Sequence, residues 1–497
     1  MLNVIGKISN QIENKKYLNI LVNHEVFVAI YIISSILWFF PFLGYFLSPV
    51  CKVTFIWGIL LVVYDLCTSR VFMKGSYWFL PVGFLISYMA TIIVNSPENF
   101  YMGIKHFFYS LIVLFLVSTV MYGKEKKRCL GYLYKINNVI ILIALIASTI
   151  SILMYIFSIS IEMEYFGNKI RQGFIDHRLF GVYTSANTGA MMGILSILFM
   201  CVNLYIKKMT IIKWNKIYCL NAIIQFIYFA LSISRGGEVT ACSVLVILLL
   251  VCFLPQTMEK LGPVKSIVTV TALFFSIIII SMAGIKLTRT SFEYLAQLVN
   301  SSKLSNTSSD NDELEKEIEF RRIESGDDLS NGRYNIWSGG LKVWEKSPLF
   351  GVADIRIDKE KLMSGKYDIS DFSDEFIKWL DQADGNLHNA YIQIIVNSGI
   401  IGFVIMFIYA LFMFIKYVKY LIDINNRSDQ VRFMVVGMIF VVVIAFAVNG
   451  LFENRLLFDR QDPYGLMFWF NIGTGSALIG EVKEKRVSLI NRNSRKE

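Results

Sequence analysis

Four side chains in this sequence are of the types that bind anions and transfer protons, namely Arg178, Arg235, Arg333 and His388. The planar guanidinium group of arginine grips a phosphate or carboxylate through two parallel hydrogen bonds. Histidine titrates near neutral pH, so an imidazole beside a hydroxyl group can act as a general base. Each residue also has an ordinary alternative: contact with lipid headgroups, stacking of a loop arginine on an aromatic ring, or capping of a helix.

Arg235 lies in a tight Ser-Arg-Gly-Gly turn between two hydrophobic runs, 217–233 and 239–254. So short a turn leaves the guanidinium group at the membrane boundary, where an ionisable side chain is costly and is a functional candidate. The adjacent glycines would let a ligand approach the backbone. Arg178 lies in a second polar loop, 160–185, beside another arginine and a histidine. That loop could bind an anion or could simply be solvated.

Arg333 and His388 belong to a long, mostly polar stretch, 286–389, that interrupts the hydrophobic sequence. A connecting segment of this length is more often functional than idle. Trp337 lies one helical turn after Arg333. Charged and apolar residues at helical spacing predict short helices at 312–323, 333–346 and 371–379. An acidic insert, 305–328, carries no pattern to which a role can be assigned.

The rest of the chain has the composition of a membrane protein. Of its 497 residues, 55% are hydrophobic and 17% are charged, whereas a soluble protein would carry about a quarter charged residues. Apolar runs of about 20 residues predict an all-α polytopic membrane protein with about twelve transmembrane helices. The predicted helices are 26–48, 53–67, 77–95, 106–122, 137–159, 186–206, 217–233, 237–254, 266–285, 389–415, 432–450 and 464–480.

Lysine and arginine gather in one set of connecting loops, which the positive-inside rule assigns to the cytoplasm. Both termini are then expected in the cytoplasm, and no cleaved signal peptide is expected before the first helix. The chain divides into helices one to nine (1–285), a large, partly helical extracytoplasmic loop (286–388), and helices ten to twelve with a cytoplasmic tail (389–497). The net charge of +10 is explained by these loops, so no nucleic acid partner is predicted.

The sequence predicts neither a metal site nor a cofactor. Its seven cysteines form no Cys-x-x-Cys pair or cluster with histidine, so neither a zinc site nor a disulfide framework is expected. Asp310-Asn311-Asp312 resembles the metal site of sugar-nucleotide transferases, but it lies in the acidic insert on the predicted outer side, where nucleotide sugars are scarce. A Gly-rich phosphate loop and a nucleophile elbow are also absent from the sequence.

Five short motifs occur together in the chain. They are the Ser-Arg-Gly turn at 234–236, Gly-Arg-x-x-Ile-Trp at 332–337, Ser-Pro-Leu-Phe-Gly-Val at 347–352, His-Asn-Ala-Tyr at 388–391 and Asn-Ser-Gly-Ile-Ile-Gly at 397–402. With the helix plan, these motifs resemble the O-antigen ligase and polymerase superfamily, which assembles bacterial surface polysaccharides. The resemblance covers 331–402 well and 178–240 loosely.

This resemblance implies a metal-independent, GT-C-like glycosyltransferase of the bacterial cytoplasmic membrane. It would transfer a glycan from a polyprenyl diphosphate lipid to an acceptor hydroxyl on the outer face. His388 would be the base, Arg235 and Arg333 would bind the diphosphate, and Arg178 would be a third cation. Preorganised guanidinium groups would stabilise the charge that develops on the leaving diphosphate. Residues predicted to support the site or to stack on sugars are Trp337, Asn389 and Tyr391.

Three functions remain open at this point. We favour a polymerase that joins polyprenyl-diphosphate-linked oligosaccharide repeat units into capsule or O-antigen, because the outer loop is large; a polymerase implies a chain-length regulator protein as partner. A ligase that moves finished glycan to a lipid, cell-wall or protein acceptor would use the same residues. A polysaccharide-lipid flippase or other transporter would more often place charges within its spans, where this sequence offers mainly Asp65.

Overall fold

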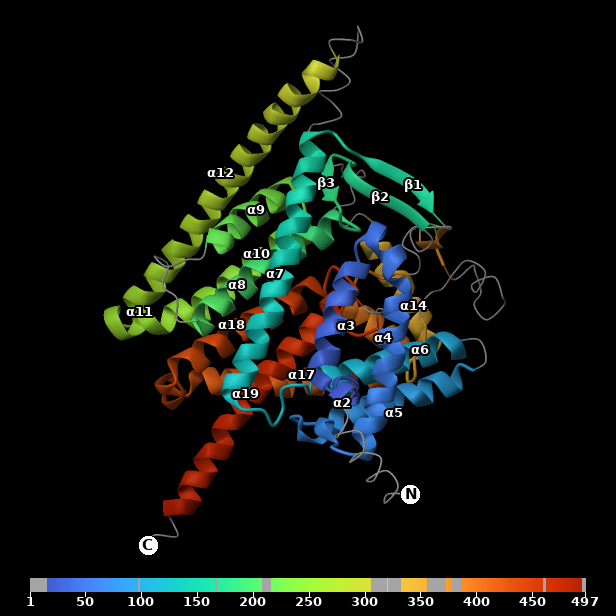
Figure 1. Ribbon diagram of the computed structural model, residues 1–497, viewed down its shortest axis with the longest axis vertical. Helices are drawn as coiled ribbons and strands as arrows, with labels where there is room; N and C mark the ends of the chain where they lie inside the picture. Colours follow the sequence, from blue (N-terminus) through green and yellow to red (C-terminus); the bar gives the residue numbers. More distant parts are fainter. Residues whose placement is uncertain are drawn as a thin grey trace.

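The fold is a bundle of long helices with a small antiparallel sheet at one end (Figure 1). A computed structural model describes the residues 16–96, 99–165, 168–207, 216–304, 320, 332–354, 372–374, 376–377, 386–458 and 462–493. Eight of the described helical segments are long and apolar enough to cross a membrane, and three apolar helices are shorter. With α19 (Pro463–Asn493), these segments correspond one to one with the predicted helices. The prediction of an all-α polytopic membrane protein is thus confirmed in its class.

The helical elements before the sheet are α2 (Lys16–Leu21), α3 (His24–Trp38), α4 (Pro41–Cys67), the 3-10 helix η1 (Val71–Lys74), α5 (Phe79–Val94), α6 (Phe100–Ile112), the π-helix η2 (Val113–Val117) and α7 (Lys126–Ile156). Those after it are α8 (Ala186–Ile206), α9 (Lys216–Ser232), α10 (Arg235–Leu248), the π-helix η4 (Leu249–Phe253), α11 (Leu254–Leu261), α12 (Pro263–Leu304), α14 (Arg333–Glu345), α17 (Ala390–Ile422), the 3-10 helix η6 (Ile424–Ser428), α18 (Gln430–Asn449) and α19.

Several helix boundaries differ from the prediction: α7, for example, begins at Lys126 rather than 137, and α19 continues to Asn493 rather than ending at 480. The break between the first two helices falls at Phe39 and Phe40, because Pro41 occupies the first turn of α4, where a missing backbone N–H costs nothing. Pro49 lies inside α4. Helix α12 differs as well, because it continues to Leu304 rather than ending at 285. The first part of the long polar stretch therefore extends the helix before it.

The segment predicted as an outer loop at 160–185 contains a three-stranded antiparallel sheet, which adds a small β element to the helical fold. Its strands, in the order β1-β2-β3, are β1 (Ile161–Tyr165), β2 (Asn168–Ile175) and β3 (Arg178–Gly181). Asp176 and His177 join β2 to β3 with φ angles of 51° and 58°. Two consecutive left-handed residues form the kind of turn that matches strand twist. This turn fixes Arg178 as the first residue of β3.

Helix α17 is broken at Gly399, whose φ is 64°. The segment 348–354 fills the break and satisfies the backbone groups that the helix leaves unpaired. The backbone amides of Val352 and Ala353 donate to the carbonyl oxygens of residues 396 and 397 at 2.9 and 3.0 Å. In the other direction, the amide of residue 400 donates to the carbonyl oxygen of residue 348 at 2.9 Å. Such internal pairing is required of irregular backbone beside a membrane.

Two glycines make this close approach possible. Gly351 and Gly399 both have positive φ, and a Cβ at either position would collide with backbone atoms of the opposite segment. Only glycine avoids both the collision and the left-handed strain. The Ser-Pro-Leu-Phe-Gly-Val and Asn-Ser-Gly-Ile-Ile-Gly motifs are thus the two halves of one interlocked unit.

A small second core packs the described part of the polar stretch against the first turns of α17. Its buried members are Ile336, Val343, Val352, Phe372, Phe376, Leu387 and Val396. The helix predicted at 333–346 is confirmed as α14, whose buried face belongs to this core. The helix predicted at 312–323 and the acidic insert lie, apart from residue 320, outside the described residues. The helix predicted at 371–379 is described only at 372–374 and 376–377, where residues 374, 376 and 377 are helical.

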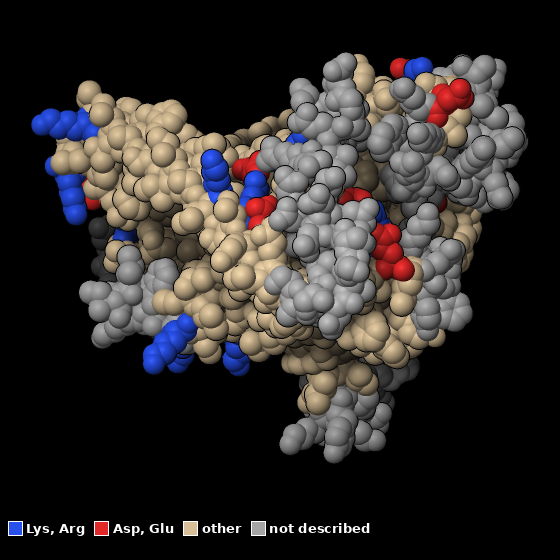
Figure 2. Space-filling model, turned by 90° about the horizontal axis from the view of Figure 1, so that it is seen from above, with Lys and Arg blue, Asp and Glu red and all other residues tan. Residues whose placement is uncertain are grey.

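On the face that Figure 2 shows, most of the described surface carries no charge. Large hydrophobic side chains are exposed along α4, α12 and α17, for example Phe46, Phe275, Ile280 and Phe407. Apolar patches of this extent mark contact with another apolar phase, which for helices of this length is lipid. The central part of the bundle is closed by a larger core that includes most of α8 and α18.

Candidate functional site

A buried carboxylate, Glu453, lies directly after α18 and is the centre of a polar cluster. Its oxygens lie 3.6 Å from Nη2 of Arg333, 3.4 Å from Nδ1 of His388 and 3.7 Å from Nη2 of Arg455. The amide Nδ2 of Asn187 donates to the same carboxylate at 3.1 Å. The cluster therefore joins segments that lie far apart in the sequence.

The predicted base, His388, is held in an unusual backbone conformation with a φ of 48°. Its own amide donates to the side chain of Asn386 at 2.8 Å. Trp337, on α14, donates from Nε1 to the carbonyl oxygen of Leu387 at 2.9 Å, so this ring fixes the peptide before the histidine. Backbone strain of this kind persists where the surroundings impose it, and it clusters at functional sites.

Asn389 and Tyr391 fasten the start of α17 to the end of α18. The side-chain oxygen of Asn389 caps α17 by accepting from the amide of Tyr391 at 3.0 Å, and its Nδ2 donates to the carbonyl oxygen of Leu451 at 3.2 Å. The hydroxyl group of Tyr391 donates to the carbonyl oxygen of Ala447 at 2.7 Å. Both side chains thus hold His388 beside the loop that carries Glu453.

Arg333 is the first residue of α14, and it follows Gly332, which has a φ of 77°. The guanidinium carbon of Arg333 lies 5.8 Å from the ring centre of Phe452, a cation–π contact. The same Phe452 ring packs against the tight turn, because a Cβ on Gly236 would lie 3.4 Å from the Cβ of Phe452. The turn that contains Arg235 and the start of α14 therefore meet on one aromatic side chain.

The tight turn is built by a helix cap and a strained residue. Ser234 caps α10 by accepting from the amide of Gly237 at 3.0 Å, which makes Arg235 the first residue of that helix. Ile233 has a φ of 50°, which is rare for a β-branched residue. This conformation reverses the chain within the turn and leaves Arg235 near the other cations.

Arg178 reaches this turn from the sheet. Its Nε donates to the carbonyl oxygen of Ser232 at 3.2 Å, and its Nη2 donates to Oδ1 of Asn187 at 2.9 Å. The hydroxyl group of Ser234 donates to the same Oδ1 at 2.9 Å. Asn187 therefore connects Arg178 and the turn to the Glu453 carboxylate.

The electrostatics of the cluster follow from these contacts. Burial lowers the pKa of the Arg178 guanidinium, and the charges of Arg333 and Arg235 lower it further, although arginine keeps its charge in proteins. Burial alone would raise the pKa of the Glu453 carboxyl, but Arg455, His388 and Arg333 together hold that pKa well below its usual value. Arg333 and Arg455 therefore flank the ionised Glu453 carboxylate, and Nε of Arg455 also lies 3.7 Å from the buried carboxylate of Asp462.

Residues 220–407 match the family described as O-Antigen ligase. This match supports the resemblance to the O-antigen ligase and polymerase superfamily. The matched segment includes Arg235, Arg333 and His388, whereas Arg178 and Glu453 lie outside it. Such proteins are membrane enzymes of the glycosyltransferase type that act on lipid-linked glycans in surface-polysaccharide synthesis, as ligases or polymerases. No curated protein matches the chain.

Three members of the cluster were not assigned to the site by the sequence reasoning: Asn187, Glu453 and Arg455. Arg455 lies between the rings of Phe39 and Tyr464, 5.1 and 5.0 Å from their centres. Glu453 follows a hydrophobic helix directly, so the criterion that singled out Arg235, an ionisable side chain at the membrane boundary, applies to it as well. Asn187 had no such signal, because amides are common near helix starts.

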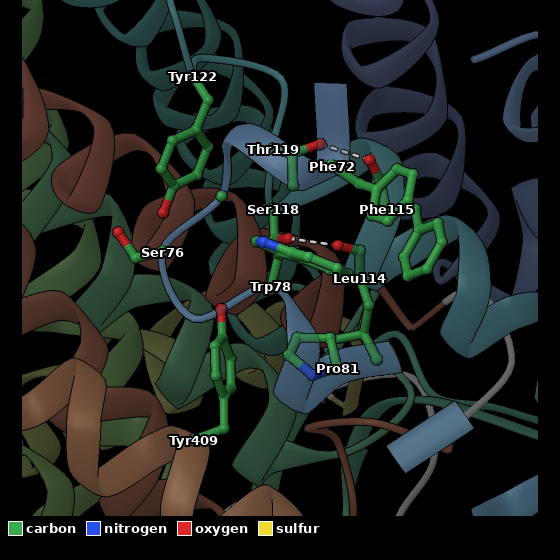
Figure 3. Close-up of a pocket in the computed structure, with 11 residues that line it drawn as sticks. Phe72, Ser76, Trp78, Pro81, Leu114, Phe115, Ser118, Thr119, Tyr122 and Tyr409 are labelled. Carbon is green, nitrogen blue, oxygen red and sulfur yellow. Dashed lines mark hydrogen bonds between the residues drawn. The ribbon is translucent and has the colours of Figure 1, made fainter. Parts of the chain in front are cut away.

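A small pocket elsewhere in the structure is separate from this cluster (Figure 3). It is lined by Phe72, Gly75, Ser76, Trp78, Pro81, Leu114, Phe115, Ser118, Thr119, Tyr122 and Tyr409. Ser118 and Thr119 each donate to carbonyl oxygens of their own chain segment. None of the predicted site residues lines this pocket. Among the described residues, no group of three or more His, Cys, Asp or Glu side chains could hold a metal ion.

The depressed pKa of Glu453 predicts a pH effect on stability. Because its folded-state pKa lies below the ordinary value of 4.5, the unfolded chain takes up a proton first as the pH falls, and the folded state loses stability. The Glu453→Gln variant lacks this titration. Its melting temperature in detergent, followed from about pH 7 down to about pH 3, should therefore fall less steeply below pH 4.5 than that of the unaltered protein. Parallel curves would contradict the assignment of an ionised Glu453.

Proposed function

We propose that this protein is a polymerase that joins polyprenyl-diphosphate-linked oligosaccharide units on the outer face of the bacterial cytoplasmic membrane. The observation that carries the proposal is that Arg333 and His388 both lie against Glu453, while the charges of Arg235 and Arg333 are close enough to act on Arg178. These side chains come from the sheet, the tight turn, α14 and the start of α17. A cluster of arginines beside a histidine suits a reaction in which an anionic group leaves and a hydroxyl group attacks.

The arginines bind the diphosphate in this proposal. As the bond between the anomeric carbon and the diphosphate oxygen breaks, the bonding electron pair stays on that oxygen and negative charge develops there. Guanidinium groups that are already in place stabilise this charge without reorganising. Arg235 and Arg333 contact the diphosphate directly, and Arg178 adds a third positive charge beside them.

His388 accepts the proton of the attacking hydroxyl group. Its Nδ1 faces the Glu453 carboxylate at 3.4 Å, so a proton on Nδ1 is shared with Glu453 and the lone pair of Nε2 is available to the acceptor. A carboxylate that orients an imidazole in this way sets which ring nitrogen acts as base. The acceptor oxygen attacks the anomeric carbon opposite the diphosphate, and the configuration at that carbon inverts.

The orientation in the membrane rests on α7. The lysine-rich segment 124–128 precedes or begins this helix, whereas its other end leads to the sheet that carries Arg178. A helix of 31 residues spans about 46 Å, enough to cross a bilayer. The positive-inside rule, which assigns these lysines to the cytoplasm, supports an orientation with the Glu453 cluster on the outer side and both termini inside.

A ligase is the second candidate, because the matched family is described by that activity. The polymerase and ligase functions can be distinguished by deleting this protein from its cell and resolving the surface glycan on a gel. The polymerase proposal expects single repeat units on their final carrier. Full-length glycan stranded on the carrier lipid would indicate a ligase, and units retained on the inner leaflet would indicate a flippase. The polymerase proposal also implies a partner protein that sets chain length.

A further inference from the structure

The segment 351–354 is hydrogen-bonded to α5 and the start of α6 as well as to α17. The hydroxyl group of Tyr88 donates to the carbonyl oxygen of Ala353 at 2.5 Å. Nδ2 of Asn95 donates to the carbonyl oxygen of Gly351 at 3.0 Å, and Nδ2 of Asn99 donates to the carbonyl oxygen of residue 352 at 2.8 Å. Three consecutive carbonyl oxygens thus have side-chain donors from α5 and the connection to α6, while the amides between them bind the broken helix α17.

A buried His–Asp pair also joins this segment to α6. Nε2 of His106, on α6, lies 3.5 Å from Oδ1 of Asp354, and their side chains are only 9% and 2% exposed. The His106 ring also packs edge-on against Phe458, with ring centres 6.2 Å apart. Buried titratable pairs contribute little net stability over apolar packing, but loss of one partner leaves the other uncompensated. A pair of this kind is suited to specifying one position of a segment rather than to stabilising the whole fold.

The segment 351–354 is connected to the proposed base, His388, through the small core. Val352 packs in that core with Leu387, and Leu387 is the residue before His388. The core also contains Ile336 of α14, which begins at Arg333. Displacement of 351–354 would therefore move both the base and a diphosphate ligand of the proposed reaction.

We infer that His106 and Asp354 are positioning residues, which hold the segment 351–354 on α5 and α6 and thereby hold His388 against Glu453. This inference rests on the proposed function and extends it: the helix pair α5–α6, which contributes no residue to the Glu453 cluster among the contacts described above, sets the geometry of the base. In Figure 1 these two helices lie side by side on the same side of the molecule as α14.

The test uses the full-length protein in detergent with two readouts, hydrogen exchange of the backbone and turnover of lipid-linked oligosaccharide. His106→Ala or Asp354→Ala should raise the amide exchange rate about tenfold or more at 351–354 and 388–398, because these segments of the variant would open locally without unfolding of the whole protein. Each should lower kcat about tenfold with little change in KM for the donor, because alignment rather than binding is lost. The double variant should be no worse than either single variant.

Conservative variants guard against simple misfolding. Asp354→Asn keeps an acceptor oxygen and His106→Gln keeps a donor, so both should retain more turnover and more protection than the alanine variants. The matched control is the other buried His–Asp pair, His24 and Asp65, whose Nε2 and Oδ1 lie 3.7 Å apart with side chains 15% and 2% exposed. Asp65→Ala should lower the melting temperature but leave exchange at 351–354 and kcat of the folded protein unchanged.

Two results would overturn the inference. One is exchange at 351–354 that rises no more in Asp354→Ala than in Asp65→Ala, and the other is raised exchange there with an unchanged kcat. Failure of the proposed function is distinguished by His388→Ala. If that variant keeps full transfer, the polymerase chemistry is wrong, whereas the exchange data still decide whether His106 and Asp354 hold the segment.

Discussion

His388→Ala should lower glycan transfer by at least about a hundredfold, because general base catalysis by a placed imidazole contributes that much or more. The variant should still reach the membrane in normal amount. His388 is half-buried, and its side chain contacts Glu453 rather than the main core. The measurement is polymer length and yield on a gel, together with turnover of purified protein on lipid-linked oligosaccharide.

His177→Asn is the matched control for this experiment. His177 lies in the turn between β2 and β3 with a φ of 58°, a conformation that asparagine adopts readily. This variant removes an imidazole from the same side of the molecule while keeping the turn, so transfer should stay close to that of the unaltered protein. Full polymer length and yield in His388→Ala would mean that another group takes the proton, and the proposed mechanism would fall.

The Glu453 carboxylate explains how the arginines can stay close together before substrate binds. Arg333 and Arg455 both approach it within 4 Å, and without it their two guanidinium charges would repel each other more strongly. Arg455 also lies 3.7 Å from the buried carboxylate of Asp462, so Arg333, Arg235 and Arg178 are the cations that remain to attract an anion in the proposed reaction. In the proposed reaction, a preorganised arrangement of this kind lowers the reorganisation needed when charge develops on the diphosphate.

Most of the helix plan could be predicted from the sequence, because each apolar run must satisfy its backbone hydrogen bonds internally. The helix predicted at 186–206 has those bounds in the structure, as α8. The sheet at β1–β3 was not predicted, since its strands are short and polar and lack a clear alternating pattern. The length of α12 was missed because the apolar signal ends before the helical propensity does.

The candidate site was only partly predictable for a different reason. Arg235, Arg333 and His388 stand out by residue type and by position at the ends of apolar runs. Their meeting point, Glu453, lies far along the sequence, and no local pattern shows that its carboxylate contacts His388. Likewise, the pairing of 348–354 with the break in α17 depends on two distant glycines with positive φ, and contacts of that kind are set by tertiary packing.

Arg333→Lys should lower transfer by about tenfold to a hundredfold although it keeps the positive charge. The planar guanidinium of Arg333 lies over Phe452 and reaches Glu453 with one nitrogen at 3.6 Å, which leaves its other donors for a diphosphate. An ammonium group on a flexible stem cannot span two oxygen atoms in that fixed plane. The loss should appear mainly in kcat if the fork contacts the charge that develops as the diphosphate leaves.

Arg171→Lys is the matched control, because Arg171 lies on β2 with its side chain 38% exposed and pairs with Asp176 at 2.8 Å. An exposed pair of this kind contributes little, and lysine can replace its point charge, so transfer should change less than about twofold. Equal losses in the two variants would show that arginine geometry at 333 has no special part. A tenfold difference between them would instead tie the reaction to the planar fork at the start of α14, beside the aromatic ring that also packs against the turn of Arg235.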